Sequence, residues 1–264
     1  LKGFIWKQRK FFSYAGLVRG LDAEISVNEL VKKWEEKKTK VILGGSFISK
    51  FQSDLNPNLI LPQNVGLSAG IFTVSRGNLK VVGEYAYKIN DPNYDNSYIY
   101  NHGEAALIQA SYSKKGIGLL LGVKRVDNMS YKSDRDGVGN FNTINFNPAL
   151  VRQHTYGLMT FYPYASQNNG EVGYQAEFLY KFKKDTKLGG KYGMDFAINY
   201  SNSQALDTNG INDTVGLIAY EAEYFSLGSN VYFQDLNVEI TKKFSKKFKA
   251  TILYAHQLYD IEQI

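Results

Sequence analysis

Apolar and polar side chains alternate along residues 171–182, and the same alternation returns along residues 191–201. The two stretches flank the sequence KKDTKLGG, which is typical of a turn. Side chains of a β-strand point alternately to opposite faces, so the pattern predicts a β-hairpin with one apolar and one polar face. A helix would instead spread the apolar positions around its circumference. The apolar face of this hairpin would carry Val172, Tyr174, Ala176, Phe178, Tyr180, Phe182, Tyr192, Met194, Phe196, Ile198 and Tyr200.

Similar alternation recurs along most of the chain and predicts further strands. Counting all of them, we expect about 12–14 strands, with a short surface helix in the charged stretch 28–38. Long connections at 52–64, 90–103 and 128–153 fall at every second junction, whereas the long stretch 201–230 falls one junction out of step. A further strand near 216–226 or near 141–150 would restore the alternation. The other expected strands are 1–12, 17–27, 39–51, 65–74, 79–89, 104–113, 117–127, 154–164, 231–244 and 248–259.

The alternation alone leaves open which face is buried. In a soluble sheet the apolar face packs inward, whereas in an outer-membrane barrel it meets lipid and the polar face lines the lumen. Tyr192 and Tyr200 would lie roughly 20 Å apart along a strand tilted by ~40°, which is close to the spacing of the two aromatic girdles of such barrels. Long strands in many successive hairpins favour the membrane alternative, because strands of soluble sheets are typically ~5–6 residues long. We therefore predict an all-β, transmembrane antiparallel up-and-down β-barrel formed by residues 1–264 as a single domain, with a soluble lipocalin-like barrel of about 8 strands as the alternative.

Composition narrows the possibilities further. The chain of 264 residues has a mean hydropathy of −0.32, and its longest apolar run, residues 117–123, is far shorter than the ~20 residues of a transmembrane helix. The absence of cysteine excludes disulfides, thiol catalysis and thiolate metal sites. The chain begins at Leu1 and ends in Glu-Gln-Ile, so we expect a longer precursor with a signal peptide, additional N-terminal strands and a closing C-terminal strand.

The polar positions of the expected strands contain acidic and basic side chains in similar numbers. Such a balance predicts ion pairs within a lumen, whereas a strongly charge-selective pore would carry rings of one sign. The lumen-lining candidates are Asp22, Glu24, Lys40, Lys80, Glu84, Lys88, Lys124, Glu171, Glu177, Lys181, Lys191, Asp195, Asp235 and Glu239. The lipid-facing candidates are Val172, Tyr174, Phe178, Tyr180, Tyr192, Phe196, Ile198 and Tyr200.

No compact motif predicts catalysis. His102, His154 and His256 are scattered, and none lies in a recognisable nucleophile–base–acid pattern, so we expect no enzyme and no catalytic residue. Two oxygen-rich stretches have spacings that a calcium ion tolerates, but neither is an EF-hand loop, and ordinary turn chemistry is favoured; we expect no metal and no cofactor. These stretches are Asp91, Asn93 and Asp95, and Asp207, Asn209 and Asp213. Asp213-Thr214-Val215 matches a short O-glycosylation sequon, and a match of three residues easily arises by chance.

The net charge of +6 comes largely from lysines in connections between strands. Lysines at such positions flank the apolar band of a barrel or meet lipid phosphates. A nucleic-acid site would need one continuous basic face with stacking aromatic side chains, so we expect no nucleic-acid partner.

Four segments of the chain are distinctive: NLKVVGEYAYKINDPNYDNSYIYNHGEAALIQASYSKKG, VKRVDNMSYKSDRD, PALVRQHTYGLMTFYPYASQNNGEVGYQAEFLYKF and VYFQDLNVEITKKFSKKFK. They resemble a Bacteroidota outer-membrane β-barrel family of unknown function, and the resemblance covers nearly the whole chain. It implies a barrel in the bacterial outer membrane, with a signal peptide and further strands before Leu1, and it assigns no activity to any residue.

We therefore expect a porin-like passive channel of unknown substrate. The alternative is a structural or docking barrel subunit of a larger outer-membrane complex for secretion, assembly or nutrient uptake. The expected partners are outer-membrane lipid and lipopolysaccharide, together with outer-membrane proteins in the alternative case.

Overall fold

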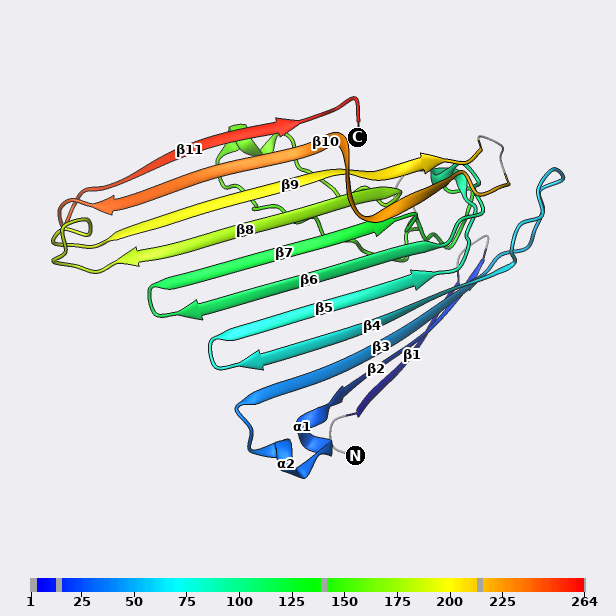
Figure 1. Cartoon of the computed structure of the whole chain (residues 1–264), viewed down its shortest axis with the longest axis horizontal. Coiled ribbons are helices and arrows are strands. Elements are labelled where there is room, and N and C mark those ends of the chain that lie inside the picture. Colours follow the sequence, from blue (N-terminus) through cyan, green and yellow to red (C-terminus); the bar gives the residue numbers. More distant parts are fainter. Residues whose placement is uncertain (1–3, 13–15, 139–141, 213–215, 264) are drawn as a thin grey trace.

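A computed structural model describes residues 4–12, 16–138, 142–212 and 216–263 (Figure 1). These residues form one 11-stranded sheet and a few short helical turns. The strands are β1 (Phe4–Phe12), β2 (Leu17–Ser26), β3 (Thr39–Phe51), β4 (Asn64–Arg76), β5 (Leu79–Lys88), β6 (Gly103–Lys114), β7 (Ile117–Asp127), β8 (Gly170–Phe182), β9 (Met194–Gly210), β10 (Tyr220–Lys243) and β11 (Lys249–Tyr259). The helical turns are α1 (Val27–Leu30), α2 (Lys32–Glu35), η1 (Tyr94–Asn96) and η2 (Gly157–Thr160).

Each strand pairs antiparallel with the strands that precede and follow it, so the sheet is an up-and-down meander. This confirms the all-β class and the up-and-down topology predicted from the alternation. β1 and β11 form the two edges, and among the described residues they do not pair with each other. The sheet is therefore open, and its two edge strands run in the same direction because nine strands alternate between them.

Successive connections alternate between the two ends of the sheet, and the longest of them, residues 128–169, lies opposite the tightest turns (Figure 1). At one end lie the tight turns after β4 and β6, which use Gly77 (φ 59°) and Gly116 (φ 83°), and the connections 27–38, 183–193 and 244–248. We call this the short-turn end. At the other end lie the connections 52–63, 89–102, 128–169 and 211–219, and we call this the long-loop end.

The predicted helix in 28–38 is present as the two turns α1 and α2. Asn28 is buried and holds this connection against β3. Its amide donates to the carbonyl oxygens of Trp34 and Thr39, and its side-chain oxygen accepts from the backbone N–H of Val41 at 2.8 Å. One polar side chain thereby satisfies backbone groups that the short helices leave unpaired.

The strand count is lower than the predicted 12–14 for two reasons. Residues 154–164 were expected to form a strand and do not; they lie within the connection 128–169 and contain η2. Residues 141–150 contain no strand among those described. An alternating sequence is therefore not sufficient to form a strand when no neighbouring strand is available for backbone hydrogen bonds.

The stretch 201–230 is not a long loop. β9 continues to Gly210, and β10 begins at Tyr220, so the segment near 216–226 that we considered as an additional strand is the start of β10. Pairing between the two strands shifts register three times between Ala222 and Phe233, which hid the regular alternation. The long connections 52–63, 89–102 and 128–169 all lie at one end of the sheet, whereas the β9–β10 connection at that end, residues 211–219, is short.

The register divides the strand residues into two faces. Lys124 faces Gly173 across the β7–β8 pair, and Gly173 faces Ser203. The same alternation continues from β2 to β11, except where the register shifts between β9 and residues 222–233 of β10. We call the face that carries Lys124 the inner face and the opposite one the outer face. The connection 128–169 folds back over the inner face, and Figure 1 shows it behind the sheet.

A small apolar core lies between the inner face and this connection. It contains Val65, Leu67, Ala86, Val126, Met129 and Tyr131, with Ile144 packed against it. The Tyr131 hydroxyl donates to the carbonyl oxygen of Val65 at 2.9 Å. The core therefore fixes the connection onto β3–β7 at the long-loop end.

Candidate functional site: the inner face and the segment that crosses it

The inner face contains nearly all of the side chains that we predicted to line a lumen. The strand register places each of them on it except Lys191, which lies in the connection 183–193. The register likewise places the predicted lipid-facing residues on the outer face, except Tyr192, which lies in the same connection. Val172 has outer-face parity but is buried.

Residues 142–169 cross the inner face, and we call them the crossing segment. The connection leaves β7 at Asn128, whose positive φ (46°) turns the chain, and returns at Asn169. The backbone N–H groups of Asn128 and Met129 donate to the carbonyl oxygens of Asn169 and Asn168 at 3.2 and 2.7 Å. These bonds hold the two ends of the connection together. The residues between them are therefore free to lie across the inner face.

A buried ion pair between β7 and β8 anchors the crossing segment. Lys124 Nζ lies 2.9 Å from Glu171 Oε1, and the two side chains are 2% and 0% exposed. Lys124 also donates to the carbonyl oxygen of Pro148 and to Ser166 Oγ at 2.7 and 2.5 Å. A buried ammonium group is stable only when several acceptors surround it, and here two of them belong to the crossing segment.

Glu171 binds the same segment from the other side. Its Oε2 accepts from the Tyr164 hydroxyl at 2.9 Å and from the backbone N–H of Gln167 at 2.7 Å. Burial, reinforced by the Glu171 carboxylate, raises the pKa of Tyr164, so its hydroxyl remains a donor. Gly173 leaves room for the pair, since a Cβ there would lie 3.1 Å from Glu171 Oε1 and 3.2 Å from Lys124 Cε.

Arg152 and His154 hold the crossing segment against β8–β10. Arg152 Nη1 donates to Asn237 Oδ1 at 2.8 Å, and its guanidinium lies 3.5 Å from Glu239 and 3.8 Å from Glu177. His154 Nε2 lies 2.6 Å from Asp235 Oδ2. Sequence reasoning assigned no role to Arg152 and placed His154 in a strand. The available signal was an arginine in a largely polar connection, opposite acidic inward positions of the neighbouring strands.

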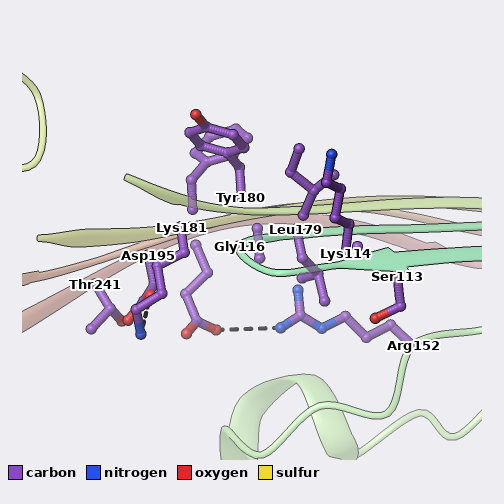
Figure 2. A pocket seen from close by; sticks show the side chains of 14 residues that line it. Ser113, Lys114, Gly116, Arg152, Leu179, Tyr180, Lys181, Asp195 and Thr241 are labelled. Atoms are coloured by element: carbon purple, nitrogen blue, oxygen red, sulfur yellow. Dashed lines mark hydrogen bonds and ion pairs between the residues drawn. The ribbon is translucent and has the colours of Figure 1, made fainter. Parts of the chain in front are cut away.

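Beside Arg152 the inner face is hollowed into a cavity of about 440 Å³ (Figure 2). Its lining combines opposite charges and hydroxyls with a few apolar side chains. In Figure 2 the guanidinium of Arg152 points toward the carboxylate that it pairs with, and Lys181 lies beside Asp195 at 3.2 Å. The lining includes Ser113, Arg152, Leu179, Lys181, Asp195, Glu239 and Thr241. Such a surface suits water and small polar solutes.

The long-loop end is consolidated by contacts between connections that are far apart in sequence. Lys50 pairs with Asp91 at 2.8 Å, and Lys132 pairs with Asp95 at 2.6 Å. Arg135 joins Gln52 and the carbonyl oxygen of Pro62. The Asp91 and Asp95 carboxylates, which we considered as calcium ligands, are thus engaged by lysines, and Asn93 caps η1.

The second calcium candidate and the possible sequon involve Asp213, Thr214 and Val215, which lie outside the described residues. Among the residues that the structure describes, no group of three or more His, Asp or Glu side chains is arranged to hold a metal ion. The same residues contain no helix long and apolar enough to cross a membrane.

The outer face is apolar and exposed. Val123 in the middle of β7 is 57% exposed, although it belongs to a central strand of the sheet. Exposed large apolar side chains of the outer face extend from β3 to β11: Leu43, Phe47, Phe72, Leu79, Tyr85, Tyr87, Ile108, Leu119, Leu121, Val123, Phe178, Ile252, Tyr254 and Leu258. Water-soluble monomers rarely expose continuous apolar patches larger than a few hundred Å², so this face is suited to a non-aqueous environment or a partner.

Topology and face distribution define a class: an up-and-down antiparallel sheet with a polar, partly covered inner face and an apolar, exposed outer face. The chain belongs to a family of unknown function, DUF6029, whose model matches residues 1–264. This confirms the part of the resemblance that concerns a family of unknown function. Comparison with curated proteins and with solved structures yields no match.

Proposed function

We propose that this protein forms the wall of a bacterial outer-membrane β-barrel that acts as a passive channel for small polar solutes. The observation that carries the proposal is the inverted distribution of side chains. Buried lysines, glutamates and asparagines lie on the inner face, and exposed leucines, valines and aromatic residues lie on the outer face. An 11-residue strand such as β7, tilted by about 40°, spans roughly 28 Å, enough to cross the ~25 Å apolar band of such barrels.

Closure of the barrel would require further strands. The edge strands β1 and β11 run in the same direction, so direct pairing between them would be parallel. Barrels of bacterial outer membranes are built from antiparallel pairs, which require an even total number of strands. An odd number of additional strands would therefore complete the wall. This is consistent with our expectation of a larger barrel domain.

A solute path remains beside the crossing segment. Asp22, Glu24, Lys40, Lys80 and Glu84 are exposed on the inner face of β2, β3 and β5, whereas Lys124 and Glu171 are covered. The crossing segment would narrow the lumen on one side and leave these mixed charges in contact with water. Mixed charges favour weak selectivity, in accord with a passive channel.

The proposal is tested by reconstituting the full chain into liposomes and planar bilayers. Flotation with liposomes reports insertion, and discrete current steps report a channel. The Arg152→Ala variant should increase the current per channel, because it releases the crossing segment from β8 and β10. The Arg19→Ala variant is the matched control: Arg19 has outer-face parity and is exposed, so its removal should leave the current unchanged.

Absence of current from inserted protein across several preparations would contradict the channel. Failure to float with liposomes would contradict the membrane location itself.

The second candidate, a structural or docking subunit of a larger outer-membrane complex, is supported by a different observation. The interlocked long-loop end carries apolar side chains that face water, including Leu55 and Ile60 in 52–63 and Phe225 near the start of β10. In this case the protein would insert without conducting. It would be extracted in mild detergent at a size larger than the monomer, and serine substitutions at Leu55, Ile60 and Phe225 would reduce that size.

A further inference from the structure

Lysine side chains are distributed very unevenly between the two ends of the sheet. At the short-turn end, the stretches 27–40, 114–116, 183–191 and 242–249 contain many lysines, and all except Lys242 are exposed. The acidic residues in these stretches are fewer, and the last stretch contains none. The short-turn end is therefore a strongly basic rim.

Four basic residues of the long-loop end are arranged differently. Lys50, Lys88, Lys132 and Arg135 are all at most 2% exposed. They pair with carboxylates or with backbone and amide oxygens of the neighbouring connections. These four buried cations thus stabilise the loops, whereas the exposed lysines at the short-turn end face solvent and remain available to a partner.

The basic rim also exposes apolar side chains among its lysines. Trp34 and Leu30 are exposed beside the lysines of α2, and Phe244 and Phe248 are exposed beside those of 242–249. Lys243 Nζ lies 5.7 Å from the centroid of the Tyr192 ring. In membrane proteins, aromatic rings and long lysine side chains are enriched at the boundary between the lipid acyl chains and the headgroups.

We propose that the short-turn end is a docking surface for anionic glycerophospholipid headgroups, a proposal that rests on the membrane location proposed above. The exposed rings would enter the boundary of the acyl chains, and the lysines would bind the phosphates above it. A soluble acidic protein fits less well, because exposed aromatic rings lie among the lysines of the rim, at the end of the apolar outer face. The surface would set which way the barrel is oriented in the membrane.

The experiment uses Trp34 as a local probe. The full chain in a Trp6→Phe background, which leaves Trp34 as the single tryptophan, is reconstituted into vesicles with brominated phosphatidylglycerol or brominated phosphatidylcholine. Brominated phosphatidylglycerol should quench Trp34 more strongly at low salt, and high salt should remove the difference. Substituting Lys32, Lys33, Lys37 and Lys38 with glutamine should abolish the preference, whereas arginine at the same positions should retain it.

Three results would overturn the inference in distinguishable ways. If the vesicles float with protein but the two lipids quench equally, the rim does not select anionic lipid. If the glutamine variant inserts and keeps the preference, these lysines are not responsible. If unlabelled lipid A displaces the brominated phosphatidylglycerol, the surface binds lipopolysaccharide phosphates. Failure of flotation would instead refute the membrane location.

Discussion

The ion pair between Lys124 and Glu171 provides a sharp test of how the crossing segment is held. The Glu171→Gln variant keeps the size of the side chain and removes its charge. Lys124 would then remain buried beside the carbonyl oxygen of Pro148 and Ser166 without a carboxylate partner. The Tyr164 hydroxyl and the N–H of Gln167 would still find an acceptor in the introduced amide oxygen.

The expected loss in the free energy of unfolding follows from the burial of the pair. Both side chains of the pair are at most 2% exposed, so water cannot replace the lost partner. Removing one member of a buried pair typically costs about 3–5 kcal/mol, because an uncompensated charge remains. The double variant Lys124→Met with Glu171→Gln removes both charges and should recover a coupling energy of about 0.5–3 kcal/mol relative to the sum of the single variants.

The assay is urea unfolding in detergent micelles or liposomes, followed by tryptophan fluorescence and extrapolated to zero denaturant. Glu177→Gln is the matched control. Glu177 is also on β8 but is partly exposed and lies 3.8 Å from Arg152, so this change should cost only about 0–1 kcal/mol. Additive effects of the Lys124 and Glu171 changes, or a Glu171→Gln cost no larger than that of the control, would refute the reasoning.

Other predictions address the outer face, a close backbone approach and one tyrosine. Val123→Lys on the outer face should destabilise the inserted protein by about 2–4 kcal/mol, whereas Gln109→Lys on the inner face should be nearly neutral; equal liposome insertion and stability of the two would contradict the assigned faces. Gly103→Ala should destabilise by about 1–3 kcal/mol in urea titrations, because the new Cβ would lie 2.3 Å from the carbonyl oxygen of Asn128, whereas Gly70→Ala meets no atom within 4 Å and should cost much less. Burial and the hydrogen bond to Asp136 raise the pKa of Tyr98 to about 12, so the folded state retains this proton above the ordinary tyrosine pKa of ~10. The contribution of Tyr98 to the free energy of unfolding is therefore complete below pH ~10 and is lost as the pH rises toward 12. Tyrosinate absorbance should show this late titration in the parent chain and lose it in Tyr98→Phe; an unchanged titration curve would contradict the assignment.

The sequence alone was sufficient for the parts of the fold that depend on local pattern. Predicted and observed limits coincide for β3 at 39–51, and the tight turns around Gly77 and Gly116 follow from their need for positive φ. The inner and outer sides of the strands were also predictable, since the period of two leaves no choice once the register is set. The prediction was wrong at 154–164, because strand formation requires a hydrogen-bonded neighbour that alternation cannot supply.

Alternation, composition and turn chemistry thus determined the all-β class, the meander of hairpins and the two chemically different faces, because all of these depend on neighbours in sequence. Only the tertiary structure decided that residues 142–169 lie across the inner face and that Lys124 and Glu171 anchor them. These contacts join residues tens of positions apart, and their energy comes from shared burial that no local pattern encodes. The tertiary structure also gathered the dispersed lysines at one end of the sheet, because the antiparallel topology brings every second connection to the same rim.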